Sequence, residues 1–423
     1  RVDRRSLHLD KMELEEGDPE DHAFSFMSER KDRNKRNCWL TYTNEKTHDI
    51  IRENIMRAPK YAGKIHGIGA RYCPSIEDKV VRFADKDRHQ LFVEPEGLDT
   101  TEVYVQGMST SMPIDVQYAF LRTIPGFEDV KMMRPAYAIE YDLLDPLQLY
   151  PTLEVIKLPG LYSAGQSNGT SGYEEAAAQG LVAGINAALK IQGKDPFILA
   201  RHEAYIGSLV DDLVTKGADE PYRMMTSRSE YRLILRQDNA DLRLTEKGHS
   251  IGLVGEERYA RFLERKKKYE EAMDYIRTQR FTPKEEINRA LESMGTAPLT
   301  TGTGADQILK RPEMTYRKMM ETLGCPSFDE EAVEEMEITV KYEGYIARQE
   351  AAVRKAARME NEKLPLDMDY LSLDGISTEA RQKMDKIRPL SLGQAARIPG
   401  VSPADISVLM VYVKQRKGKK SAE

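Results

Sequence analysis

The sequence predicts an α/β region followed by an all-α region. Strand-like runs alternate with glycine and proline turns up to about residue 195. From about residue 200 the pattern becomes helical and highly charged, as in EERYARFLERKKKYEEAMDYI. Between the two regions stands AGQSNGTSGYEEAAAQGLVAGINAA, residues 164–188. This stretch is typical of the strand, turn and helix near the end of a dinucleotide-binding domain.

Composition excludes several classes of protein. The chain of 423 residues is long enough for roughly two to four domains. Its net charge of −6 means that any nucleic-acid site is a local basic patch. Neither an apolar run of membrane-spanning length nor a signal-peptide pattern is seen. Cys38, Cys73 and Cys325 are too widely spaced to suggest a disulfide framework or a metal site, so a protein of the reducing cytoplasm is expected.

Three runs in the first region are predicted to be strands: CWLTY at 38–42, QLFV at 90–93 and EVYV at 102–105. Pro95 and Gly97 break the chain between the last two runs. Further along, TAPLTTGTGAD at 296–306 is predicted to be a loop, and most of the chain after this loop is predicted to be helical.

A helix is predicted after the glycine turn at 165–172. Ser171 and Glu174 form a capping-box pattern at its start. Lys190 and Gly193 suit its C-terminal end. Four small residues on this helix would give a smooth face that approaches a sheet closely: Gly180, Ala183, Gly184 and Ala187.

The glycine turn has two interpretations. Backbone N–H groups at a helix N-terminus stabilise a phosphate, so Gly165 and Gln166 are candidates for contact with a flavin or nucleotide. The alternative is an ordinary strand–helix connection with tight packing. A dinucleotide domain normally opens with G-x-G-x-x-G, but GIG at 67–69 and GTG at 302–304 both lack the third glycine. We therefore expect the closing half of such a fold without its opening half.

A run of arginines stands in SRSEYRLILRQDNADLR. Arg228, Arg232 and Arg236 recur every four residues, which predicts that they share one face of a helix. The planar guanidinium suits phosphate contacts, and Tyr231 beside them is placed to stack on a base. The alternative is a solvated face whose arginines pair with nearby acids: Glu230, Asp238 and Asp241.

The C-terminal segment contains a clear helix start. Ser402, Pro403 and Asp405 supply an N-cap, a first-turn proline and an early acid. After them comes an apolar stripe, which is either the core of a small helical bundle or partly an interface: Ile406, Leu409, Met410 and Val413.

Several long stretches resemble the MnmG/GidA family of flavin-dependent tRNA uridine-modifying enzymes. They are YAGKIHGIGARYCPSIEDKVVRFADKDRHQLFVEPEGL, STSMPIDVQ, AGQSNGTSGYEEAAAQGLVAGINAA, TSRSEYRLILRQDNADLRLTEKG and SLGQAARIPGVSPADISVLMVYVK. They stand in the family's order over nearly the whole chain. The resemblance implies the C-terminal two-thirds of such a protein, and the family carries its glycine fingerprint for the FAD pyrophosphate in the part before it.

The resemblance also implies an activity. Family members act with the GTPase MnmE on C5 of the wobble uridine of certain tRNAs, and they are homodimers. They install an aminomethyl or carboxymethylaminomethyl group, with methylenetetrahydrofolate as carbon donor and ammonium or glycine as nitrogen donor. FAD, reduced by NADH, supplies the redox chemistry. Because the fingerprint is missing, the FAD site of this chain is expected to be incomplete and the chain alone inactive.

The resemblance assigns roles to residues as well. Gly165 and Gln166 match the FAD contact, and the tRNA-binding part of the family includes Arg228, Arg232 and Arg236. The C-terminal helices match the part that contacts MnmE and tRNA. The NAD-binding stretch corresponds to Gly69, Ala70, Arg71, Tyr72, Cys73, Pro74, Ser75, Ile76, Glu77, Asp78, Lys79, Val80, Val81, Arg82 and Phe83.

Cys73 matches a proposed catalytic cysteine of the family. A thiolate is the nucleophilic form of cysteine, and Arg71 close by in sequence would favour it. Addition of a thiolate to C6 of uridine makes C5 nucleophilic. The alternative is a buried small hydrophobic residue, which is also how Cys38 and Cys325 are interpreted. Glu77 and Asp78 are candidates for proton transfer or for simple salt bridges.

The resulting fold prediction is an incomplete FAD/NAD(P)-binding Rossmann-like domain with an inserted α+β domain, then helical domains. The predicted boundaries are 1–100 for the NAD-binding-like insertion, 101–195 for the closing part of the FAD domain, 196–340 for a helical domain and 341–423 for a C-terminal helical subdomain. Two other functions stay open. One is a tRNA- and partner-binding module without flavin, and the other is a relative of folate-dependent tRNA uracil methyltransferase.

Overall fold

The computed structural model describes residues 1–17, 23–28, 36–65, 74–218, 220–365 and 367–420. The chain divides into two compact units. The first is built mainly from Arg1–Leu144, and the second from Asp145–Asn168, Gly172–Ala218 and Met224–Glu423. Each unit has its own hydrophobic core.

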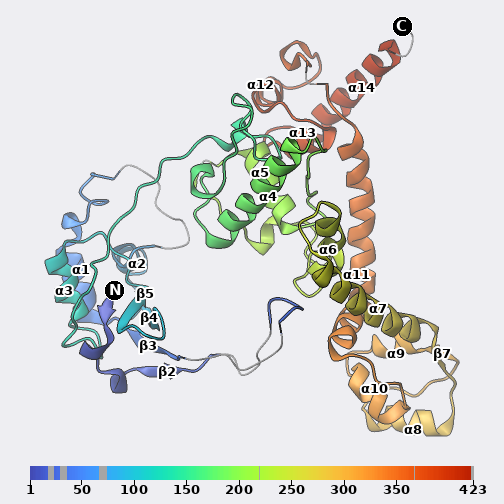
Figure 1. The fold of residues 1–423 in the computed structure, drawn as a ribbon, viewed down its shortest axis with the longest axis horizontal. Coiled ribbons are helices and arrows are strands. Elements are labelled where there is room, and N and C mark those ends of the chain that lie inside the picture. The colour runs from blue at the N-terminus through green and yellow to red at the C-terminus, as the bar shows by residue number, and fades with distance from the viewer. Residues whose placement is uncertain (18–22, 29–35, 66–73, 219, 366, 421–423) are drawn as a thin grey trace. The chain divides into compact units, whose positions relative to one another are not determined.

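The first unit is organised around a five-stranded antiparallel sheet (Figure 1). The strand order is β1-β5-β4-β3-β2, so β4 and β5 form a hairpin within it. The register places Phe92 opposite both Leu40 and Gln106. The strands are β1 Val2–Asp3, β2 Glu13–Glu15, β3 Cys38–Tyr42, β4 Gln90–Pro95 and β5 Glu102–Gln106. The three predicted strands are thereby confirmed.

Three helices share the core of this sheet: α1 Glu45–Glu53, α2 Ile76–Arg82 and α3 Ile114–Leu121. Alternate residues such as Leu91 and Val93 point into that core, as the period-two pattern of a half-buried strand requires. The expected domain boundary at residue 100 falls between β4 and β5, which pair with each other. The turn at Pro95 and Gly97 therefore connects a hairpin rather than two domains.

The second unit begins with irregular chain and α4, Tyr173–Ile191. Residues 149–162 form isolated antiparallel bridges, and the described part of the chain contains no parallel strand before α4. The N-cap of α4 is Gly172, not Ser171, so no side-chain oxygen caps this helix. Gly193 has φ +65° just beyond the C-terminal end, which confirms the predicted stop.

The two glycines of the predicted small-residue face of α4 do not pack as predicted. Gly180 and Gly184 are exposed, and a Cβ on either would meet nothing within 4 Å. The helix instead buries a neighbouring face through polar and apolar side chains: Glu175, Gln179, Val182, Ala183, Asn186 and Leu189.

The rest of the second unit is helical, apart from the short pair β6 Arg280–Phe281 and β7 Thr303–Gly304. This confirms the change in pattern near residue 200. The helices are α5 Tyr205–Lys216, α6 Ala240–Ser250, α7 Glu256–Thr278, α8 Glu285–Ser293, α9 Ala305–Leu309, α10 Tyr316–Leu323, α11 Glu330–Asn361, α12 Thr378–Ile387, α13 Leu392–Arg397 and α14 Pro403–Lys420.

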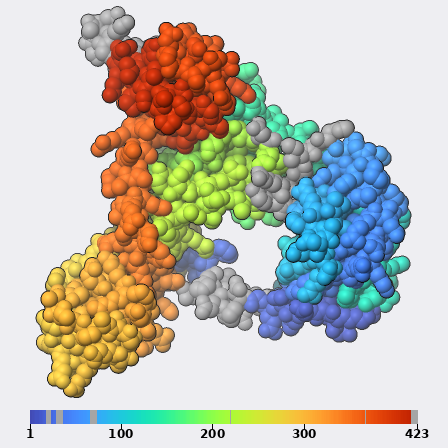
Figure 2. Space-filling view, turned by 180° about the vertical axis from the view of Figure 1, so that it is seen from behind, coloured from blue at the N-terminus to red at the C-terminus, as the bar shows by residue number. Residues whose placement is uncertain are grey.

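The long helix α11 runs from the group of α7 to α10 to the group of α12 to α14 (Figures 1 and 2) and takes part in the core of each. Met336 and Val340 in its first half belong to a core with α7 to α10, which also contains Cys325. Met359 near its end packs against the core of α12 to α14. The expected boundary at 340/341 thus lies inside one continuous helix. Among the described residues, we find no helix with the length and apolarity to cross a bilayer.

Candidate functional site

The glycine turn before α4 has a geometry that only glycine accommodates easily. Gly165 opens a short 3-10 helix, Gly165–Asn168, with φ +74°, in the left-handed region. A Cβ at this position would lie 3.1 Å from the Cβ of Ala176 on α4. The turn is therefore pressed against the first turns of the helix, while Gln166 beside it is exposed.

A buried glutamine of α4, Gln179, fixes the turn by hydrogen bonds. The Oε1 atom of Gln179 accepts hydrogen bonds from the backbone N–H of Gly165 at 3.1 Å and from Nδ2 of Asn168 at 2.9 Å. Its Nε2 atom is buried without a hydrogen-bond partner among the described residues. The start of α4 at Gly172 is also uncapped by a side chain, and backbone N–H groups at such a helix start can hold an anionic group.

The stretch matched to NAD binding is described only from Pro74 onward, and Cys73 lies outside the described residues. Ser75 caps α2 by accepting a hydrogen bond from the backbone N–H of Asp78 at 3.3 Å. Val81, Arg82 and Phe83 are exposed at the far end of this short helix.

The two acids of α2 are buried rather than solvated. Glu77 accepts hydrogen bonds from Ser111 through its backbone N–H at 3.0 Å and its hydroxyl at 2.9 Å. Asp78 accepts hydrogen bonds from Lys60 Nζ at 2.7 Å and from Tyr61 Oη at 3.0 Å. Burial alone would raise the pKa of Asp78, but these hydrogen bonds outweigh it and lower that pKa. Asp78 is therefore held as an anion in a salt bridge.

The arginine run does not form the predicted helix. Residues Thr226–Arg228 are a 3-10 helix, the chain then turns, and α6 begins only at Ala240. Gln349 of α11 explains the difference, because its Oε1 accepts hydrogen bonds from the backbone N–H groups of Leu233 and Ile234, each at 3.2 Å. Its Nε2 donates to the carbonyl of Glu230 at 3.2 Å. A side chain from a distant helix thus satisfies part of this backbone, beside the turn hydrogen bonds that the N–H groups of Ile234 and Leu235 donate to the carbonyl of Tyr231.

The three arginines consequently have different environments. Arg232 is exposed. Arg236 is largely buried and forms ion pairs with Asp238 at 3.1 Å and with Glu335 of α11. The prediction that the arginines share one face is therefore wrong, since Arg236 is turned into the protein by two carboxylates that lie far apart in sequence.

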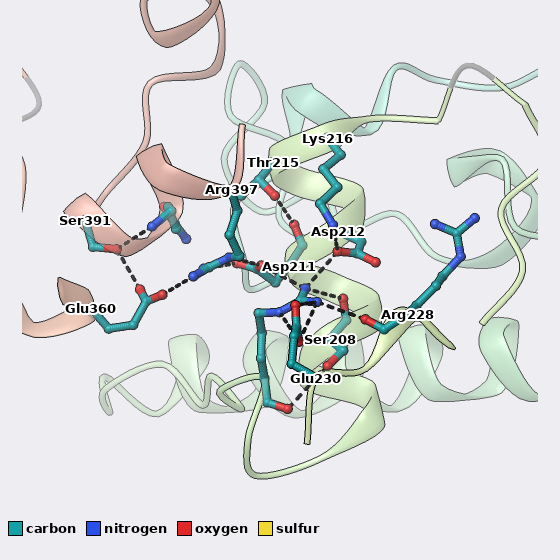
Figure 3. A network of polar contacts seen from close by, with 12 residues as sticks. Ser208, Asp211, Asp212, Thr215, Lys216, Arg228, Glu230, Glu360, Ser391 and Arg397 are labelled. Carbon is teal, nitrogen blue, oxygen red and sulfur yellow. Dashed lines mark hydrogen bonds and ion pairs between the residues drawn. The ribbon is translucent and has the colours of Figure 1, made fainter. Parts of the chain in front are cut away.

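A buried arginine fixes the start of this segment. Arg201, with 7% of its side chain exposed, donates from Nη1 to Asp212 at 2.7 Å and to Asp211 at 3.1 Å. From Nη2 it donates to Glu230 at 2.9 Å and to the carbonyl of Arg228 at 3.2 Å. Figure 3 shows that the side chain of Arg228 points away from this network. Arg201 thus fixes the backbone of Arg228, and the guanidinium of Arg228 points away from the buried network.

The same network reaches the C-terminal helices. Arg397, the last residue of α13, donates to Asp211 and to Glu360 (Figure 3). Glu360 also accepts a hydrogen bond from Ser391 at 2.6 Å. Sequence reasoning missed Arg201, Arg397 and Gln349. A signal for the first existed, because Asp212 interrupts an otherwise apolar helical face and a buried carboxylate needs a cationic partner.

The C-terminal helix α14 begins as predicted. The hydroxyl of Ser402 accepts a hydrogen bond from the backbone N–H of Asp405 at 3.2 Å, and Asp405 accepts from the backbone N–H of Ser402 at 2.8 Å. Three members of the predicted apolar stripe, Ile406, Leu409 and Val413, are buried in the core of the bundle. The fourth, Met410, is half-buried.

Comparison with known families accounts for most of the chain. Residues 1–195 match the family model described as "Glucose inhibited division protein A". Residues 256–350 and 352–423 match the C-terminal helical domain and the C-terminal helical bundle of the "tRNA modifying enzyme MnmG/GidA". A mixed α/β region followed by these two helical modules defines the class. The chain belongs to the MnmG/GidA family.

Individual relatives support the assignment to this family. The chain is 55% identical over 99% of its length to the tRNA uridine 5-carboxymethylaminomethyl modification enzyme MnmG of Caldicellulosiruptor saccharolyticus, and 56% identical over 98% to that of Clostridium kluyveri. It covers 67% and 66% of those proteins, so it spans about two thirds of their length. The form I crystal structure of Aquifex aeolicus GidA superposes with a TM-score of 0.85 at 46% identity, over 97% of this chain and 67% of that one.

Proposed function

We propose that this chain carries the greater part of an enzyme that modifies C5 of the wobble uridine in tRNA. The product is an aminomethyl or carboxymethylaminomethyl group, made with methylenetetrahydrofolate, FAD and NADH. The observation that carries the proposal is 55% identity over 99% of the chain to an MnmG enzyme. A folate-dependent tRNA uracil methyltransferase is disfavoured, because the helical modules at 256–350 and 352–423 match those of MnmG/GidA.

The glycine turn is the proposed flavin contact. Gly165 and Gln166, with the N-terminus of α4, would hold part of FAD, and when bound the flavin supplies the redox chemistry. The buried Nε2 atom of Gln179 supports this role, since a buried donor without an acceptor is costly unless a ligand completes it. The stretch from Gly69 to Phe83 is the proposed site for NADH.

Cys73 is the proposed nucleophile. Its thiolate would add to C6 of uridine, so that the electrons of the C5–C6 double bond move toward O4 and C5 becomes nucleophilic. C5 would then bond to the one-carbon unit supplied by methylenetetrahydrofolate, whose bond to its carrier breaks. Loss of the C5 proton, and then of the thiolate from C6, restores the double bond. A nearby cation favours the thiolate, and Arg71 is the closest candidate in sequence.

The tRNA contacts are assigned to the segment after residue 225. Arg228 and Arg232 would contact phosphates, because the first points away from the buried network and the second is exposed. Arg236 contributes as a positioning residue, since its ion pairs with Asp238 and Glu335 hold the end of the same segment. The C-terminal helices would contact the GTPase MnmE, and a homodimer is expected.

The experiment is complementation followed by nucleoside analysis. This chain is expressed in a bacterium that lacks its own MnmG, and wobble-uridine products are measured by mass spectrometry of digested tRNA. Restored modification that disappears in Cys73→Ser but survives in Cys38→Ser supports the enzyme. In parallel, the purified chain is tested for flavin absorbance and for tRNA binding. Absence of both modification and tRNA binding contradicts the proposal.

The second candidate is a binding module that docks tRNA and the GTPase without flavin. This candidate rests on the sequence, in which neither GIG at 67–69 nor GTG at 302–304 completes a G-x-G-x-x-G fingerprint. Tight tRNA binding by a colourless protein that restores no modification would identify the module.

A further inference from the structure

The long helix α11 changes its charge midway. Residues 330–340 contain five acidic and no basic residues, whereas residues 341–358 contain five basic and two acidic ones. The helix dipole favours this order of charges, but only within the first and last turns. The basic residues begin about five turns before the C-terminal end, so the dipole does not account for most of them. Lys341 and Arg354 pair with Glu337 and Glu350 of the same helix, but the other three basic residues still make this half of α11 locally basic in a chain of net charge −6.

Two tyrosines stand exposed on the basic half. Tyr342 and Tyr345 expose 45% and 56% of their surface, and their ring centroids lie 6.4 Å apart. The guanidinium carbon of Arg348 lies 5.2 Å from the centroid of the Tyr345 ring. α11 fully buries no residue after Val340, and only Met359 near its end packs against the C-terminal core, so neither tyrosine is needed to fill a core. An aromatic pair with a stacked arginine is the combination that holds unpaired bases and their phosphates.

This surface continues into the segment assigned to tRNA. Gln349 lies one helical turn beyond Tyr345 and is hydrogen-bonded to the backbone of Leu233 and Ile234. Arg232 precedes these two residues and is exposed. The aromatic pair therefore lies next to one of the proposed phosphate contacts, within the same compact unit.

A glycine between the tyrosines lacks a structural reason. Gly344 sits inside a 32-residue helix, is exposed, and has open space where a Cβ would stand. Glycine destabilises a helix interior relative to alanine. A bare backbone at this point is explained if a ligand approaches the helix between the two rings.

We propose that Tyr342 and Tyr345, with Arg348, form a stacking platform for unpaired nucleotides of the bound RNA. The inference rests on the proposed tRNA-modifying function and deepens it by naming the part of the substrate that this surface takes. Bases in a loop are unstacked and present their faces, whereas those in a duplex do not. The platform therefore selects single-stranded segments, while Arg228 and Arg232 contact phosphates of either kind.

The test measures the affinity of the full chain for two RNA probes. One is a tRNA anticodon stem with its loop, and the other is a fully paired duplex of the same length. The variants are Tyr342→Ala/Tyr345→Ala, the ring-preserving Tyr342→Phe/Tyr345→Phe, and the exposed control Tyr137→Ala. Arg228→Ala/Arg232→Ala is measured alongside, with light scattering to report the oligomeric state.

Stem-loop affinity is expected to fall about ten- to a hundredfold in the alanine pair. Duplex affinity should hold, and the phenylalanine pair and Tyr137→Ala should bind as wild type. Unchanged stem-loop affinity in the alanine pair overturns the platform, and a simultaneous change in oligomeric state would assign this face to contact between copies instead. If the arginine variant loses affinity while the alanine pair does not, only the platform fails. A wild-type chain that binds neither probe contradicts the proposed function itself.

Discussion

Arg397 donates two parallel hydrogen bonds to Asp211, from Nε to Oδ2 and from Nη2 to Oδ1, each 2.7 Å long. The two residues are 186 positions apart and expose 21% and 12% of their side chains. Paired contacts of this kind need the planar fork of arginine. The contact ties the end of α13 to α5, and through Arg201 the same aspartate is linked to the segment of Arg228.

Replacement of Arg397 by alanine should loosen the C-terminal helices. It leaves Asp211 with one fewer cation in a partly buried site, where breaking a pair costs about 3 kcal/mol. Arg397→Lys should cost roughly half as much, because a single ammonium does not reproduce the fork. Hydrogen exchange of amides in α12 to α14 measures the free energy of opening of these helices. As a control, Arg317→Ala removes an arginine with an 84% exposed side chain and should change it by less than about 0.5 kcal/mol.

Glu335 makes the stability of the helical unit depend on pH. Burial, and then the neighbouring Asp238, raises the pKa of Glu335 from 4.5 to about 7, although Arg236 opposes the rise. Its Oε2 atom has no hydrogen-bond partner among the described residues, so nothing there stabilises a negative charge on that oxygen. The folded protein therefore binds more protons than the unfolded chain between these values. The stabilisation is complete below pH 4.5 and is lost as the pH rises through 7.

Glu335→Gln should remove this pH dependence, because an amide has no proton to lose. Between about pH 5 and pH 7 the wild type should lose about 2 kcal/mol relative to the variant, at about 1.4 kcal/mol per unit. Urea unfolding of both proteins at several pH values provides the measurement. Parallel stability curves would show that Glu335 is ionised throughout.

Local sequence patterns predicted the parts of the fold that neighbouring residues decide. Strands such as β3 and the helix start at Ser402 were predictable, because period-two burial and capping act over a few positions. The arginine run was mispredicted, since Gln349 and Glu335 on a distant helix decide its shape. The prediction that the small residues of α4 approach a sheet also failed for its two glycines, because the expected partner sheet is not among the described residues.

Gly344→Ala should stabilise the protein and weaken RNA binding together. Alanine in a helix interior is favoured over glycine by about 0.8 to 1 kcal/mol, and open space surrounds the new methyl group. If a nucleotide lies over this position, the methyl group obstructs it. Thermal unfolding and stem-loop binding are measured on the same preparation. A variant that gains stability and binds RNA as well as wild type would remove Gly344 from the platform.

The arginines of the 226–239 segment should separate into two groups when tRNA binding is measured against salt. Arg228→Ala/Arg232→Ala should reduce the slope of log affinity against log salt concentration by about 1.4 to 1.8. With fewer phosphate contacts, tRNA releases fewer counterions when it binds. The fold should survive, because the buried network holds Arg228 through its backbone carbonyl, which alanine keeps, and Arg232 is exposed. Arg236→Ala should instead destabilise the helical unit, because it leaves Glu335 and Asp238 side by side without their cation.

Binding at three salt concentrations and thermal unfolding of the same variants distinguish these groups. Arg317→Ala serves as the matched exposed control, because its loss should alter neither the slope nor the stability. If the double variant and the wild type give coincident salt lines, Arg228 and Arg232 do not contact phosphate. If Arg236→Ala changes the slope without loss of stability, its ion pairs with Glu335 and Asp238 are expendable. The guanidinium would then belong to the RNA contact rather than to its support.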